Sequence, residues 1–222
     1  MIVSIDKKFC IFLNPKTGTT TLCDIFENKP YVDFAIHEHM DYTDFIAKYP
    51  TEKDIVLYSF YRNPVDRFIS AYSYALNSPA CLAASRIYTH YINSAHLNPF
   101  NTSATLTQEQ LEEVKALSLK DIFTHQNAKS ILRLLSDVTP GLFLPQVTWL
   151  DYEGINLLNF DCFEDEVKKI LTLAQDSDIL HQIPKLNAVD PVYTSVTEEE
   201  AELIKSMYQK DYEFFLSKNI TF

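Results

Sequence analysis

The stretch Phe9-Cys-Ile-Phe-Leu-Asn-Pro-Lys-Thr-Gly-Thr-Thr-Thr-Leu22 decides the fold of this 222-residue chain. It begins with a continuous apolar run, Phe9–Leu13, of the length of a buried strand, and Asn14-Pro15 ends that strand. A helix is expected to start within Thr19–Thr21 and to run to about Phe26. This order of strand, turn and helix predicts an α/β fold in which helices cover both faces of a parallel sheet.

The same alternation continues along the chain. Further strands are predicted at Tyr31–His39, Ile55–Tyr61 and Leu157–Phe160, and helices at Tyr42–Tyr49, Pro64–Ala75 and Glu164–Ala174. Residues 78–104 lack clear periodicity, so we expect an insertion over roughly 78–144 that is partly helical. Because no linker or internal repeat is present, a single domain spanning residues 1–222 is the simplest organisation.

Two capping boxes predict helix starts in the irregular parts of the chain. The first, Thr107-Gln-Glu-Gln110, opens a helix to about Leu117, and the following Leu119–Leu135 has helical spacing. The second, Thr197-Glu-Glu-Glu200, opens a last helix that ends near Ser217. The sequence predicts that this helix is continuous, with four apolar residues toward one side: Leu203, Met207, Phe214 and Phe215.

The composition excludes several classes of protein. The 30 acidic against 19 basic residues give a net charge of -11, which disfavours a nucleic-acid groove. With only three glycines, the chain contains neither the glycine-rich dinucleotide fingerprint nor a standard Walker A loop. No apolar run of about 18 residues and no signal sequence appear, so we expect no membrane span and a cytoplasmic location. The four scattered cysteines are typical of reduced core thiols rather than of a disulfide framework or a zinc site.

The turn after the first strand has the features of an anion site. Unpaired main-chain N–H groups and the positive end of the helix dipole point toward an anion at such a turn. Gly18 allows close approach of the backbone, Thr19–Thr21 add hydroxyl donors, and Lys16 adds a positive charge. An ordinary capped helix with an exposed lysine explains the same residues, so this stretch alone leaves both interpretations open.

A second strand-to-helix turn carries a second set of anion-binding residues. Arg62-Asn-Pro-Val-Asp-Arg-Phe-Ile-Ser70 follows the predicted strand Ile55–Tyr61, and a guanidinium with a hydroxyl eight residues later can hold a phosphate. The alternative is a helix in which Arg67 pairs with Asp66 or a nearby glutamate. Two such turns at the carboxyl edge of a parallel sheet indicate a ligand with two anionic ends.

These residues resemble a known family. Pro15-Lys-Thr-Gly-Thr-Thr-Thr-Leu22 resembles the 5'-phosphosulfate loop of sulfotransferases that use PAPS (3'-phosphoadenosine 5'-phosphosulfate), and Arg62–Tyr72 resembles their 3'-phosphate motif. His37-Glu-His-Met-Asp-Tyr-Thr-Asp-Phe45 is similar to the segment that carries the catalytic histidines of the carbohydrate branch, in particular of heparan sulfate 2-O-sulfotransferase-like proteins. Phe163-Glu164 and Tyr208–Phe214 resemble the C-terminal pattern of that branch.

The resemblance implies a fold related to P-loop kinases and transfer of a sulfuryl group from PAPS to an acceptor hydroxyl, leaving PAP. It implies PAPS-binding residues at both ends of the donor: Lys16, Thr17, Gly18, Thr19, Thr20, Thr21, Arg62 and Ser70. It places His37 and His39 in the active site, with His39 as the general base, and Lys16 at the leaving oxygens. The family needs no metal, and the expected acceptor is a small, neutral or lipid-linked saccharide.

Other interpretations of these residues stay open. His37 and His39 could be ordinary surface or core histidines, or an HxH metal site, which lacks a clear third ligand. Glu164 is a second candidate base, and Gln146 resembles a position near the acceptor. Lys185 and Asn187 could close over the nucleotide. The competing functions are a noncatalytic module that binds PAP or another nucleotide, and a P-loop-type kinase.

Overall fold

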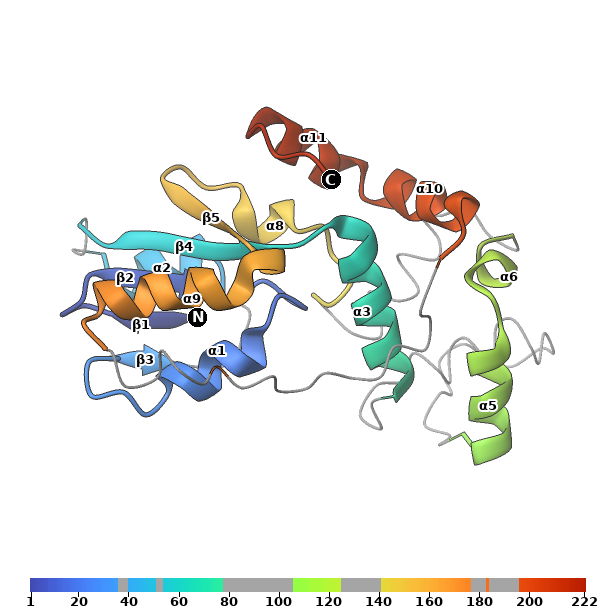
Figure 1. Cartoon of the computed structure of the whole chain (residues 1–222), viewed down its shortest axis with the longest axis horizontal. Helices are drawn as coiled ribbons and strands as arrows, with labels where there is room; N and C mark the ends of the chain where they lie inside the picture. The colour runs from blue at the N-terminus through green and yellow to red at the C-terminus, as the bar shows by residue number, and fades with distance from the viewer. Residues whose placement is uncertain (36–39, 51–53, 78–105, 125–140, 177–182, 184–195) are drawn as a thin grey trace. The chain divides into compact units, whose positions relative to one another are not determined.

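The computed structural model describes residues 1–35, 40–50, 54–77, 106–124, 141–176, 183 and 196–222 (Figure 1). The chain divides into two compact units, each built from segments that are distant in sequence. The first unit comprises Met1–Asn63 and Gln146–Ala188, and the second comprises Pro64–Pro145 and Val189–Phe222.

The first unit is a five-stranded sheet with helices. Its strands are β1 (Ile2–Ser4), β2 (Phe9–Phe12), β3 (Phe34–Ala35), β4 (Val56–Tyr61) and β5 (Ile155–Asn159), in the spatial order β3-β1-β2-β4-β5. Its helices are α1 (Thr19–Phe26), α2 (Tyr42–Lys48), α8 (Val147–Leu150), the 3-10 turn η2 (Phe160–Cys162) and α9 (Phe163–Leu173). The predicted α/β class is therefore confirmed for this unit.

The sheet is mostly parallel, and β1 is the exception. β2 pairs in parallel with β4, and β4 pairs in parallel with β5. β1 is antiparallel to both β2 and β3, so the prediction of an entirely parallel sheet is wrong at this strand. β1 escaped notice because a three-residue strand that is buried throughout shows no alternation. In the parallel part, Phe12 aligns with Ser59, which brings the carboxyl ends of β2 and β4 to one edge.

Helices cover both faces of this sheet, as predicted. Figure 1 shows α9 in front of the strands and α2 behind them. On one face, Leu22 and Phe26 of α1 and Val167 of α9 share an apolar cluster with Ile11 of β2. On the opposite face, Phe45 of α2 packs in a second cluster with Cys10, Phe12 and Leu57. Burial of these apolar faces holds the strand-end loops in place.

The second unit is helical in its described residues. It contains α3 (Pro64–Asn77), α5 (Gln108–Ala116), α6 (Leu119–Thr124), α10 (Glu198–Met207) and α11 (Gln209–Ser217). The predicted capping box at Thr107 is present, since its hydroxyl accepts from Gln110 N while the Gln110 amide accepts from Thr107 N. The helices α5 and α6 confirm helical structure in the expected insertion, whereas its residues 78–105 and 125–140 lie outside the described part.

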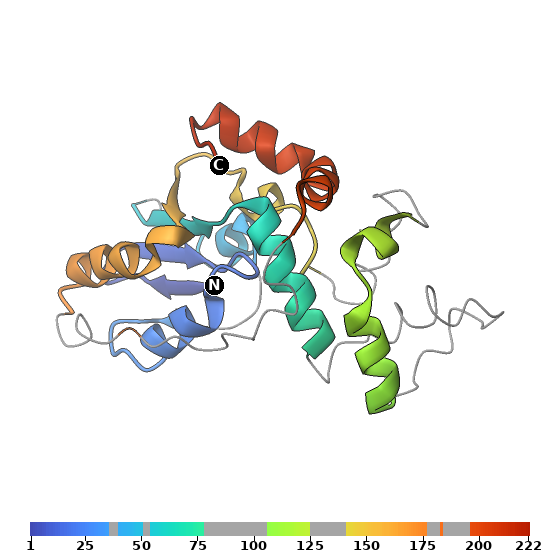
Figure 2. The same cartoon turned by 45° about the vertical axis from the view of Figure 1, so that its right-hand side comes forward.

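The last predicted helix is two helices rather than one. α10 ends at Met207 and α11 begins at Gln209, and the two run in different directions (Figure 2). At the junction Tyr208 has φ -106 and ψ 27, outside the helical range. Tyr208 is fully buried, and its hydroxyl donates to Phe143 O at 2.9 Å. These tertiary contacts of Tyr208 outweigh the local apolar periodicity that predicted a continuous helix.

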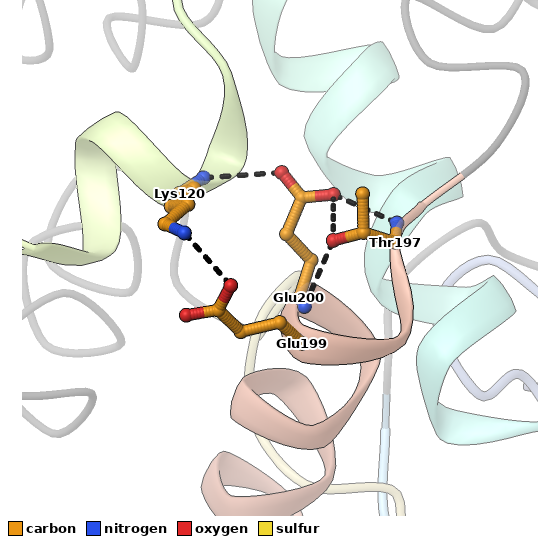
Figure 3. Close-up of polar contacts among 4 residues, drawn as sticks. All are labelled: Lys120, Thr197, Glu199 and Glu200. Carbon is orange, nitrogen blue, oxygen red and sulfur yellow. Dashed lines mark hydrogen bonds and ion pairs between the residues drawn. The ribbon is translucent and has the colours of Figure 1, made fainter.

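Glu200 joins the starts of two helices in the second unit (Figure 3). One of its carboxylate oxygens accepts from Thr197 N at 2.9 Å and from the Thr197 hydroxyl, completing the predicted second capping box. The other oxygen accepts from Lys120 N, in the first turn of α6, at 3.1 Å. The side chain of the neighbouring Glu199 forms an exposed ion pair with Lys120 Nζ at 2.8 Å. Glu200 therefore caps α10 and ties it to α6 through main-chain hydrogen bonds.

Glu200→Ala should lower the free energy of unfolding by about 1–2 kcal/mol, because two helix starts lose a charge-assisted cap together. Glu199→Ala is the matched control, since it removes one carboxylate from the adjacent position and costs under about 0.5 kcal/mol. Urea unfolding of both variants, followed by the helical circular dichroism signal at about 222 nm, measures the difference. Equal effects of the two substitutions would show that Glu200 has no role beyond its charge.

Two expectations about composition can be compared with the described residues. Within them, no helix has the length and apolar character needed to cross a membrane. Cys10 and Cys23 are buried free thiols, as expected of core cysteines, but Cys162 is exposed at the end of η2, so the expectation of a core thiol is wrong there.

Candidate functional site

The loop between β2 and α1 contains two residues in the left-handed backbone conformation. Lys16 has φ 65 and Gly18, the N-cap of α1, has φ 81. Between them, the buried Thr17 donates its hydroxyl to Asn14 O at 2.7 Å, which closes the turn. A backbone that reverses hand over successive residues forms a concave surface suited to anions. The structure therefore places the predicted anion loop at the start of an eight-residue helix.

Lys16 occupies a costly conformation and a costly environment. Non-glycine residues seldom adopt a positive φ, and the conformation costs on the order of 1 kcal/mol. Burial, and secondarily the positive charge of Arg62, lower the pKa of Lys16 from 10.5 to about 8. The exposed Lys8 also has a positive φ, of 54, so the backbone conformation does not distinguish the two interpretations. The partly buried charge of Lys16 beside Arg62 does, and it favours the anion-loop interpretation over that of an exposed lysine.

Arg62 lies next to this loop, at the end of the neighbouring parallel strand. Its Nη1 donates to Lys16 O at 3.4 Å, a long hydrogen bond that brings the two predicted cationic residues together. Its guanidinium lies over the Phe160 ring, with 4.7 Å between the guanidinium carbon and the ring centroid. Phe160, in η2 after β5, was not predicted to take part. An aromatic face under a guanidinium restricts its orientation while its edge stays able to donate.

The threonines of the loop differ in exposure. Thr19 and Thr20, in the first turn of α1, are half-buried, and Thr21 is buried. Because the Thr17 hydroxyl donates to Asn14 O, this side chain stabilises the loop. The first-turn position of Thr19 and Thr20 is the one from which main-chain N–H groups of a helix meet an anion.

Gly18 is also in close contact with an aromatic ring. A Cβ atom built on Gly18 would lie 2.5 Å from Cε2 of Phe163, the first residue of α9. Phe163 in turn packs on Phe60, with 4.9 Å between the ring centroids. This position therefore requires glycine for two reasons, namely its positive φ and its close approach to Phe163.

Two buried amides connect the loop to the end of β4. Asn14 Nδ2 donates to Phe60 O at 3.1 Å and to Gln146 Oε1 at 3.0 Å. Gln146 Oε1 also accepts from Arg62 N at 3.0 Å, and Gln146 Nε2 donates to Arg62 O at 2.7 Å. Sequence reasoning missed Asn14, which it interpreted only as the end of the strand. Gln146, expected near an acceptor, is fully buried and uses its amide to hold Arg62.

Arg67 has a different environment from the one expected. In the second unit, the buried Arg67 donates from Nη1 to Leu142 O at 3.2 Å and from Nη2 to Leu144 O at 2.6 Å. Its guanidinium carbon lies 5.3 Å from the Tyr208 ring centroid. Arg67 thus anchors main-chain carbonyls of residues 142–144, and no ion pair with Asp66 is found among the described contacts. Its role in the motif is structural.

The structure does not bring every predicted site residue together. His37 and His39 lie outside the described residues, as do Lys185 and Asn187. Ser70 is half-buried on α3 of the second unit, whereas Arg62 belongs to the first, so its pairing with Arg62 stays a prediction. Glu164 is exposed in the first turn of α9. Within the described residues, no group of three potential metal ligands is found.

The described part of the site therefore defines a class of structure: an α/β unit with a cationic loop at the ends of parallel strands. Comparisons with protein-family models, with curated proteins and with solved structures found no match.

Proposed function

We propose that this protein is a PAPS-dependent sulfotransferase that sulfates a hydroxyl group, with a saccharide as the acceptor. The observation that carries the proposal is the convergence of Lys16 and Arg62 beside a left-handed loop at the start of α1. Two cations are held within one loop environment although the chain has a net charge of -11. Such an arrangement is stabilised by an anionic ligand and costs free energy without one.

The donor chemistry fits the residues of the loop. The 5'-phosphosulfate would be bound by Lys16 and by the main chain of Gly18 to Thr21 at the helix start, where anions are favoured. Arg62, with Ser70 as the predicted second donor, would bind the 3'-phosphate, since a guanidinium matches phosphate geometry. A fold related to P-loop kinases, implied by the sequence resemblance, is part of this proposal and is supported by the β2-loop-α1 order.

The proposed reaction needs one base and one leaving-group stabiliser. His39 accepts the proton of the acceptor hydroxyl, and His37, two residues before it in sequence, is the second histidine of the site. The bond from the acceptor oxygen to sulfur forms while the bond from sulfur to the 5'-phosphate oxygen breaks, and PAP leaves with that electron pair. The Lys16 ammonium stabilises the negative charge that develops on the leaving phosphate. No metal is required in this scheme.

A calorimetric comparison of PAP with ADP tests donor specificity. The two ligands carry the same adenine and ribose but distribute their phosphates differently, so binding PAP at least about tenfold more tightly indicates recognition of the 3'-phosphate. Equal or tighter binding of ADP or ATP would contradict the proposal and favour the kinase alternative.

Transfer itself is tested with radiolabelled PAPS and a panel of neutral and lipid-linked saccharides. His39→Ala should lose transfer and keep PAP affinity, because the base acts on the acceptor and not on the donor. Wild-type protein that binds PAP but transfers to no saccharide or other hydroxyl compound would indicate the noncatalytic module. Transfer that persists in His39→Ala would contradict the assigned base.

A further inference from the structure

Gln146 provides both hydrogen-bonding groups of its amide to the main chain of a single residue. Its Oε1 accepts from Arg62 N and its Nε2 donates to Arg62 O, at 3.0 and 2.7 Å. The pair imitates the hydrogen bonding of a neighbouring strand at the point where β4 has ended at Tyr61. Arg62 is thereby held in a fixed main-chain position although it lies just beyond the strand.

The same amide holds the Lys16 loop. Gln146 Oε1 is shared with Asn14 Nδ2, and Asn14 O accepts the Thr17 hydroxyl that closes the turn. The orientations of both amides follow from their partners: Arg62 N can only donate, and Phe60 O can only accept. Gln146 and Asn14 are each fully buried, so these hydrogen bonds are shielded from bulk solvent.

We infer that Gln146 is a positioning residue of the anion site, because its amide fixes Arg62 relative to the loop that carries Lys16. The identity of the ligand, PAP, rests on the proposed function, whereas the hydrogen bonds that hold Arg62 and the loop do not depend on it. Gln146 acts on the site through its hydrogen bonds to Arg62 and Asn14.

Gln146→Met tests the inference with nearly the same side-chain volume. The substitution removes the Gln146 amide from Arg62 N and Arg62 O and one of the two acceptors of Asn14 Nδ2, so Arg62 should move relative to Lys16. We expect PAP affinity to fall about tenfold, after correction for the fraction of the variant that is folded. We also expect the Lys16 pKa to rise toward its ordinary value, since the charge of Arg62 helps to lower it. An NMR titration of the lysine side chains, assigned with Lys16→Met, measures this pKa.

Ser59→Ala is the control for a purely structural effect. The buried Ser59 hydroxyl donates to Phe12 O at 2.9 Å and also joins β4 to β2, but it does not contact Arg62. Its loss should lower stability without changing the Lys16 pKa or PAP affinity. If Gln146→Met behaves like Ser59→Ala in both readouts, the positioning role is overturned.

Gln146→Glu keeps the test decisive if Gln146→Met fails to fold. A protonated carboxyl group has the shape of the amide and can donate to Arg62 O, whereas a carboxylate faces that carbonyl with a negative charge. PAP affinity relative to wild type should therefore recover as the pH is lowered. A ratio to wild type that is independent of pH would overturn the inference.

Pyrophosphate binding and the Lys16 pKa separate failure of this inference from failure of the proposed function. If wild type does not bind PAP, the sulfotransferase proposal fails. The positioning role then still predicts weaker pyrophosphate binding and a raised Lys16 pKa in Gln146→Met.

Discussion

Lys16→Met should bind PAP about 100-fold more weakly than wild type and at the same time unfold at a higher urea concentration at pH 7. The affinity falls because a charge-assisted contact to phosphate is worth about 1.5–3 kcal/mol. The stability rises because methionine removes a partly buried charge next to Arg62 while preserving most of the length of the side chain. A gain in stability together with a loss of binding is the expected signature of a functional residue kept at a structural cost.

The pH dependence of stability gives this prediction a defined window. Burial, followed by the charge of Arg62, lowers the pKa of Lys16 in the folded chain to about 8 from 10.5. Between these values the unfolded chain binds more protons, so the free energy of unfolding of wild type rises with pH from about 8 to about 10.5. Below pH 8 the full cost is present, about 1 kcal/mol after allowance for solvent screening. Lys16→Met should lack this rise.

PAP affinity should show the opposite trend with pH. Bound phosphate stabilises the ammonium form of Lys16. Binding therefore takes up a proton when the pH exceeds about 8, the pKa of Lys16 in the ligand-free protein. The affinity of wild type should then fall by up to about tenfold per pH unit above this value. Calorimetry in two buffers of different ionisation enthalpy measures the proton uptake directly. If the binding enthalpy at a pH of about 8.5 is the same in both buffers, binding takes up no proton, which would argue against Lys16 as the phosphate ligand.

Lys8→Met is the matched control, because Lys8 and Lys16 lie just before and after the same strand, β2. Lys8 also has a positive φ, of 54, and carries the same charge. Its side chain is exposed, and its Nζ forms a 3.7 Å ion pair with Asp54. PAP affinity and the pH dependence of stability should be unchanged in Lys8→Met. If both lysine substitutions weaken binding equally, the effect comes from net charge and not from the loop.

The sequence was sufficient to predict the strand-loop-helix unit and the position of Arg62 at the end of the neighbouring strand. The β2 strand, the helix that follows Gly18, and Arg62 at the end of β4 all have local signals: an apolar run, a turn residue, and a proline two residues later. Their convergence could also be predicted, since parallel strands bring their carboxyl ends to one edge. Local pattern and tertiary structure agree in this region.

The residues that hold the site together could not be predicted in the same way. Asn14 and Gln146 are 132 positions apart in sequence, and nothing in the polar composition around either residue indicates the other. The break at Tyr208 has a similar cause, since the contact between its hydroxyl and Phe143 spans 65 positions. Long-range hydrogen bonds of buried side chains are set by packing, and periodicity does not report them.

Gly18→Ala should lower the free energy of unfolding by about 2–5 kcal/mol, since two independent costs add. The positive φ of 81 contributes about 1–2 kcal/mol for any residue with a Cβ. The contact with Phe163, at 2.5 Å in the unrelaxed geometry, contributes about 1–3 kcal/mol because the ring and the start of α9 must move. Urea unfolding measures the sum.

Gly154→Ala and Phe163→Ala separate the two costs. Gly154 has a similar φ of 79, but a Cβ built on it meets no atom within 4 Å, so its substitution measures the backbone cost alone. In the double variant Gly18→Ala/Phe163→Ala, the ring contact is absent and the added cost of the Gly18 substitution should fall to that of Gly154→Ala. If Gly18→Ala is no more destabilising than Gly154→Ala, then the Phe163 ring moves aside at no cost in free energy. The aromatic packing would then not explain why this loop has glycine at its helix start, and the positive φ alone would account for it.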